Sequence, residues 1–189
     1  MTEITLPEGY ALEQADRGFA LTARLRCPMS QARALAVVSA SWVRDAIGGG
    51  AKILWPNHVV VDGKRVCAME CRARGDKIML TFRPVDGAVP EDFERRVIRA
   101  AIAALEAYPE NRSELLQRYC EHCLTVMKFV DTAYRGVPVY GFAFAVDKHG
   151  GLMVMTQESQ TILTLYGGEA VIAEKREQEM PDLPRMPGR

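Results

Sequence analysis

Residues 53–84, ILWPNHVVVDGKRVCAMECRARGDKIMLTFRP, carry the strongest structural signals in this sequence. An apolar run at its start is interrupted by Trp55-Pro56-Asn57-His58 and ends at Asp62-Gly63, a strong signal for a two-residue hairpin. A second strand is predicted over residues 64–72, and the turn residues Arg74-Gly75-Asp76 separate it from a third strand over residues 76–83. The stretch therefore predicts neighbouring antiparallel strands of one sheet.

Helix signals lie on both sides of this stretch. Residues 19–27 alternate between apolar and polar side chains, as in a half-buried strand, and Ser30 is the expected N-cap of a helix that ends at Gly48-Gly49-Gly50. After the sheet, Pro90 is expected to open a helix with Glu91 and Asp92 in its first turn. Ser113 is expected to cap a second helix, which carries Cys120 and Cys123. The pattern predicts an α+β fold in which helices pack on a sheet.

The C-terminal third has a different character. Short strands separated by turn residues are predicted over residues 137–146, 152–157, 161–166 and 170–173. They form a small all-β unit, and the charged, proline-rich tail after it is expected to be disordered. We therefore predict a core over residues 1–123, a C-terminal domain over residues 124–174 and a tail over residues 175–189.

Composition excludes several classes of function. The 189 residues include 24 Lys+Arg and 24 Asp+Glu, so no excess of positive charge favours nucleic acid. The N-terminus has no secretion signal, and no apolar stretch approaches the roughly 20 residues that span a bilayer, which predicts a cytoplasmic protein that does not bind membranes. Five cysteines, an odd number, are expected to stay reduced.

The cysteines invite a metal or redox interpretation, which the spacing does not favour. Cys67 and Cys71 lie four residues apart on a predicted strand, roughly 13 Å at about 3.3 Å per residue, which is too far for two ligands of one zinc ion. Cys120 and Cys123 lie late in a predicted helix, whereas a thioredoxin-like pair opens one. Packing is the favoured role for all four, and no residue is predicted to bind a metal.

One segment of the sequence contains a motif that is specific enough to compare with a known family. Leu54-Trp55-Pro56-Asn57-His58, followed after a hairpin by Lys64-Arg65-Val66-Cys67-Ala68-Met69, resembles the biotin protein ligase pattern K-W-P-N-D, spacer, K-hydrophobic-[A/C]-G-[I/L]. Residues 141–173, with GFAFAVDKHGGLMVM and YGGEAVIA, resemble the small C-terminal domain of that family.

This resemblance implies a mixed or antiparallel sheet packed by helices, of the class II aminoacyl-tRNA synthetase and biotin ligase type, plus an SH3-like C-terminal barrel. It also implies an activity. Biotin or lipoate would be activated by MgATP to an acyl-adenylate and transferred to a lysine of a carrier domain.

This sequence departs from the family pattern at its charged residues and at its glycine. Leu54 replaces the first lysine, His58 replaces the aspartate on the magnesium side, and Ala68 replaces the glycine against which biotin lies. The second lysine falls on Arg65, although a shift of one residue would recruit Lys64. The family's glycine- and arginine-rich loop has no counterpart, so we expect that the isolated chain does not adenylate biotin and needs no cofactor.

Several interpretations stay open. Trp55, Asn57, Arg65 and Ala68 are the candidate ligand-binding residues, although Trp55 and its neighbouring proline can persist for packing alone. A non-catalytic ligand- or partner-binding protein is favoured over a working or split ligase that uses Arg65 or Lys64 and takes the missing loop from a second polypeptide. A homodimer through an exposed sheet edge is compatible with both.

Overall fold

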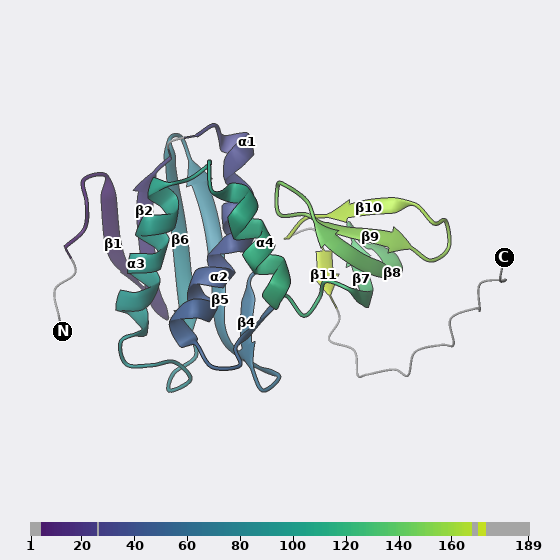
Figure 1. Cartoon of the computed structure of the whole chain (residues 1–189), viewed down its shortest axis with the longest axis horizontal. Coiled ribbons are helices and arrows are strands. Elements are labelled where there is room, and N and C mark those ends of the chain that lie inside the picture. Colours follow the sequence, from purple (N-terminus) through teal and green to yellow (C-terminus); the bar gives the residue numbers. More distant parts are fainter. Residues whose placement is uncertain (1–4, 26, 168–169, 173–189) are drawn as a thin grey trace.

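The computed structural model describes residues 5–25, 27–167 and 170–172. Its larger part is built on a six-stranded antiparallel sheet (Figure 1). In sheet order the strands are β1 (Tyr10–Ala15), β2 (Gly18–Arg24), β6 (Lys77–Pro84), β5 (Lys64–Arg74), β4 (His58–Val61) and β3 (Lys52–Leu54). The predicted hairpin between β4 and β5 is confirmed: Asp62 and Gly63 both have positive φ, 49° and 73°, as the tight turn requires.

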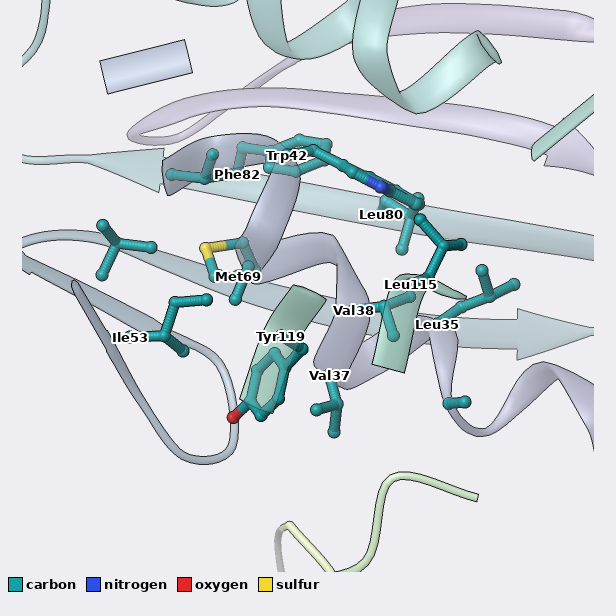
Figure 2. Close-up of a cluster of buried hydrophobic side chains, with 14 of the residues drawn as sticks. Leu35, Val37, Val38, Trp42, Ile53, Met69, Leu80, Phe82, Leu115 and Tyr119 are labelled. Carbon is teal, nitrogen blue, oxygen red and sulfur yellow. The ribbon is translucent and has the colours of Figure 1, made fainter. Parts of the chain in front are cut away.

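Four helices cover one face of this sheet (Figure 1). They are α1 (Met29–Ala32), α2 (Leu35–Ile47), α3 (Phe93–Glu106) and α4 (Arg112–His122). Between sheet and helices lies the core, where Met69, Leu80 and Phe82 meet side chains of α2 and α4 such as Trp42 and Tyr119 (Figure 2). Each large apolar side chain buried in this way stabilises the fold by about 1.5–3 kcal/mol.

The helix starts differ from the predicted ones. Ser30 lies inside α1 rather than at an N-cap, because Pro28, which lacks an amide hydrogen, already occupies the cap position. A turn at residues 33–34 interrupts the helical structure between α1 and α2. Ala34 rather than a polar residue precedes α2, because that position is fully buried. Ser113 likewise lies within α4, whose N-cap is Asn111.

The start of α3 is also later than predicted. Pro90 accepts a hydrogen bond from the backbone N–H of Phe93, 3.0 Å away, so residues 90–92 form a turn and the helix begins at Phe93. Phe93, Val97, Ala101 and Leu105 of this helix are buried, and Tyr108 is buried just beyond the helix end.

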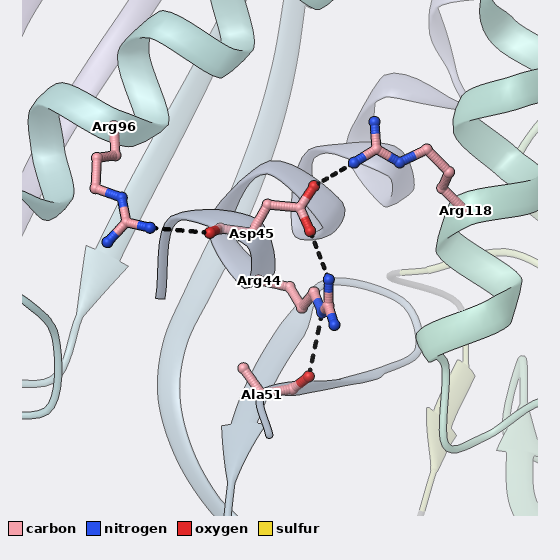
Figure 3. A network of polar contacts seen from close by, with 5 residues as sticks. All are labelled: Arg44, Asp45, Ala51, Arg96 and Arg118. Carbon is pink, nitrogen blue, oxygen red and sulfur yellow. Dashed lines mark hydrogen bonds and ion pairs between the residues drawn. The ribbon is translucent and has the colours of Figure 1, made fainter. Parts of the chain in front are cut away.

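A charge network joins three helices at the C-terminal end of α2 (Figure 3). Asp45 is unfavourable at the negative end of a helix dipole, but its carboxylate accepts hydrogen bonds from Arg44 at 2.7 Å and from Arg118 of α4 at 2.6 Å. Arg96 of α3 donates to the Asp45 carbonyl at 3.4 Å. The groups are partly exposed, so each ion pair contributes at most about 1 kcal/mol.

A second, five-stranded antiparallel sheet forms the C-terminal unit (Figure 1). Its order is β10 (Ile162–Leu165), β9 (Leu152–Thr156), β8 (Val137–Val146), β7 (Lys128–Tyr134) and β11 (Ala170–Ile172). The sequence predicted four of these strands and missed β7, whose inward side includes the polar Thr132, 4% exposed. Strand β1 was also missed, because an edge strand with mixed side chains alternates weakly.

The predicted tail, residues 175–189, lies outside the described residues. Among the described helices, none combines the length and apolar character needed to cross a membrane.

Candidate functional site

The Trp55-Pro56-Asn57 segment forms the turn between β3 and β4. Leu54 and His58 pair across it, and the Trp55–Pro56 peptide bond is cis. Trp55 is only 3% exposed although it lies in a turn, so the turn is folded into the protein rather than projecting into solvent.

Trp55 connects the two sheets. Its indole N–H donates to the carbonyl oxygen of Gly150, 3.1 Å away in the loop between β8 and β9, and its backbone N–H donates to the hydroxyl of Thr125 at 3.1 Å. Gly150 fits closely there, because an added Cβ would lie 2.8 Å from a methyl of Val37 on α2. The polar group of Trp55 is therefore occupied by a structural contact.

The loop that receives Trp55 is held by Asp147. One carboxylate oxygen accepts the backbone N–H groups of His149 and Gly151, each at 2.8 Å, and the other accepts the hydroxyl of Tyr166 at 3.1 Å. This aspartate lies in the GFAFAVDKHGGLMVM stretch that resembles the small C-terminal domain of the family, and here it shapes the contact between the two sheets.

The other two residues of the turn are also engaged within the protein. The carbonyl of Pro56 accepts the hydroxyl of Tyr119, 3.1 Å away, and the complete burial of Tyr119 raises the pKa of that phenol well above its usual value. The side-chain amide of Asn57 donates to the carbonyl of Met69, while the backbone N–H of Met69 donates to the carbonyl of Asn57 at 3.0 Å. Asn57 thus fastens the turn to β5.

The remaining candidates lie on the face of the sheet opposite the helices. Ala68 is directly opposite His58 on one side and Arg83 on the other, while Arg65 is opposite Val60. Residues that face each other across antiparallel strands project to the same side of the sheet. His58 and Val60 lie two residues apart on β4, so they also project to one side. Arg65 and Ala68 therefore share the second face, whereas Lys64 lies at the end of the hairpin, opposite Val61.

Glu70 is the acidic centre of this face. Its carboxylate contacts Arg83 at 3.0 Å and Arg72 at 2.5 Å, and these hydrogen bonds, that from Arg83 first, lower the pKa of Glu70. The sequence analysis did not select Glu70 or Arg83. The Arg74-Gly75-Asp76 turn was the available signal, because a hairpin closed there pairs residue 68 with residue 83.

This arrangement can be compared with known structures. The fold is similar to that of biotin protein ligase from Aquifex aeolicus, with a TM-score of 0.65, 17% sequence identity and coverage of 82% of each chain. The chain has the fold of a biotin protein ligase. No family model matches the sequence, and no curated protein is significantly similar to it.

Two further structures share this biotin ligase fold. A biotin protein ligase-like protein of unknown function from a Silicibacter species has a TM-score of 0.60 at 14% identity, covering 78% of this chain and 77% of its own. The biotin acetyl coenzyme A carboxylase synthetase of Helicobacter pylori has a TM-score of 0.51 at 16% identity, covering 77% of this chain and 73% of its own. The fold resemblance expected from the sequence is therefore confirmed.

The cysteines of this biotin ligase fold are arranged for packing. All five are free thiols. Burial raises the pKa of Cys67 and of Cys71 to about 12, so neither is a thiolate near neutral pH. Within the described part of the chain, no group of three or more His, Cys, Asp or Glu residues could hold a metal ion.

Proposed function

We propose that this protein is a biotin protein ligase relative that does not form an acyl-adenylate alone and uses the inherited fold to bind a ligand or a protein partner. The observation that carries this proposal is the use of the Trp55-Pro56-Asn57 turn. The side-chain donors of Trp55 and Asn57 and the carbonyl of Pro56 all bond to other parts of the protein. The best-preserved part of the family pattern therefore has a sufficient structural role without a ligand.

The residues present do not fit biotin and MgATP. His58 stands where the family pattern has a carboxylate, and the described residues offer no cluster of metal ligands. Ala68 adds a methyl group on the face where the resemblance places biotin. The missing carboxylate disfavours magnesium-bound polyphosphate and the added methyl group disfavours biotin, so no adenylation step is assigned to this chain.

One observation favours the alternative, a ligase completed by a second polypeptide. Arg65 and Arg83 are exposed on the same face as Ala68, and Arg83 lies directly opposite it, so positive charge is present where an anion would approach. On this alternative, Arg65 or Lys64 takes the role of the family's second lysine. The SH3-like character of the C-terminal unit and a homodimer through the edge strand β1 are further parts of the proposal.

Native mass spectrometry tests the proposal. The purified protein is incubated with biotin or lipoate and MgATP, and we expect the mass of the unliganded chain. A matched variant, Leu54→Lys/His58→Asp/Ala68→Gly, restores three elements of the pattern and should gain affinity for biotin while keeping its circular dichroism spectrum. Retention of an acyl-adenylate by the unmodified chain would overturn the non-catalytic proposal and favour the ligase.

A further inference from the structure

The C-terminal sheet presents large apolar side chains to solvent in one continuous row. Phe129, Phe142, Met155 and Ile162 occupy directly paired positions on β7, β8, β9 and β10. Phe142 is half-buried, and the other three are 47%, 46% and 58% exposed. We call these four residues, with Tyr140, the aromatic row.

Its aromatic side chains form one ordered cluster. Phe129 stacks on Tyr140 with ring centroids 5.9 Å apart and meets Phe142 edge-to-face at 5.4 Å. The core of the unit is on the opposite face, where Val130, Ala143 and Val154 are buried. A solvent-facing sheet surface is normally polar, and exposed apolar groups gathered in this way mark interaction sites.

The sequence after the last described strand supplies a matching segment. Residues 180–187 read Met-Pro-Asp-Leu-Pro-Arg-Met-Pro, in which an apolar residue followed by proline recurs every third position. A polyproline II helix has three residues per turn, so it would place Met180, Leu183 and Met186 along one edge at intervals of about 9 Å. Proline-rich segments of this kind bind to aromatic-lined surfaces.

The position of β11 allows residues 180–187 to reach the aromatic row. Strand β11 pairs with β7 from Tyr134 to Thr132, so the chain leaves Ile172 in the direction of Phe129. The residues between Ile172 and Met180 can extend about 25 Å, at roughly 3.3 Å each. The row crosses three strand spacings, about 14 Å, which is comparable to the roughly 19 Å from Met180 to Met186 in a polyproline II helix.

We propose that the aromatic row is a binding site for a proline-rich segment in polyproline II conformation, and that residues 180–187 of the same chain are its occupant. The segment covers the exposed rings with its apolar edge. The site is separate from the Ala68 face and does not depend on adenylation.

Oxidation of Met180 and Met186 by dilute peroxide, followed by mass spectrometry, tests the proposal. The reference is a free peptide of residues 173–189. A local concentration on the order of 1 mM against a dissociation constant on the order of 0.1 mM gives about tenfold slower oxidation in the full-length chain. A Phe129→Ser/Tyr140→Ser variant should oxidise at the peptide's rate.

The control is Val137→Ser, which removes another exposed apolar side chain of the same sheet, 63% exposed and outside the row. This variant should keep the protection, and circular dichroism should show that both variants are folded. Equal rates in the full-length chain and the peptide would overturn the proposal, as would protection that survives in the double variant. Protection lost on dilution would place the segment on a second copy and overturn docking within one chain.

Discussion

Replacement of Trp55 by phenylalanine tests whether this residue holds the two sheets together. The change removes the indole N–H and leaves the carbonyl of Gly150, a buried residue, without its donor at 3.1 Å. A buried acceptor that loses its partner costs about 1–3 kcal/mol. The smaller ring also loses packing, so the total effect needs a reference in which packing alone changes.

Trp42 provides that reference. It is 4% exposed, against 3% for Trp55, and its indole N–H has no hydrogen-bond partner in the described part of the chain. Trp42→Phe therefore removes a similar volume without breaking a hydrogen bond, and it also removes a buried donor that has no partner. We expect Trp55→Phe to lower the free energy of unfolding by at least about 1–3 kcal/mol more than Trp42→Phe does.

Urea unfolding followed by circular dichroism measures this difference, and thermal unfolding should show a further loss of about 2–4 °C per kcal/mol for a chain of this size. Limited proteolysis should also cut Trp55→Phe faster between the two sheets. Equal destabilisation by the two substitutions would refute a stabilising role for the Trp55–Gly150 hydrogen bond, and would leave Trp55 available for a ligand.

Three other predictions concern single contacts. Asn57→Ala breaks the bond to the Met69 carbonyl and should destabilise the protein by about 1 kcal/mol in urea. Lys52→Ala, a control at an exposed position of the neighbouring strand β3, should cost less, and the reverse order would contradict the role assigned to Asn57. Because Arg83 and Arg72 lower the pKa of Glu70 in the folded state, the stabilisation from this carboxylate is present above the unfolded pKa of about 4.3 and is lost as pH falls through the lower folded value. Glu70→Gln should therefore reduce the loss of stability between pH 5 and pH 3, which is roughly the range of carboxylate titration. If the urea midpoint of the variant depends on pH as that of the unmodified protein does, Glu70 does not contribute to this loss. Cys67 and Cys71, whose pKa values burial raises to about 12, should resist iodoacetamide at pH 8 in the folded protein and react in urea, and rapid labelling of the folded protein at either position would show that the thiol is accessible.

Local signals predicted much of the fold. Alternating side chains and the Asp62-Gly63 turn located β4, β5 and β6, because hairpin pairing depends on neighbours in the sequence. Helix starts were less accurate, since Pro28 and the burial of Ala34 outweighed the capping preference of Ser30. The strands β1 and β7 were missed because their stability comes from the partner strand more than from their own pattern.

The candidate site was also predictable only in part from the sequence. Sequence comparison could show that Leu54, His58 and Ala68 depart from a ligase pattern, because the type of side chain alone decides charge and volume. It could not show that Trp55 donates to Gly150 or Asn57 to Met69, since these contacts join residues that only the folded chain brings together. Residue identities therefore specified which groups of the ligase pattern are absent, and tertiary packing determined that the groups still present are bonded within the protein.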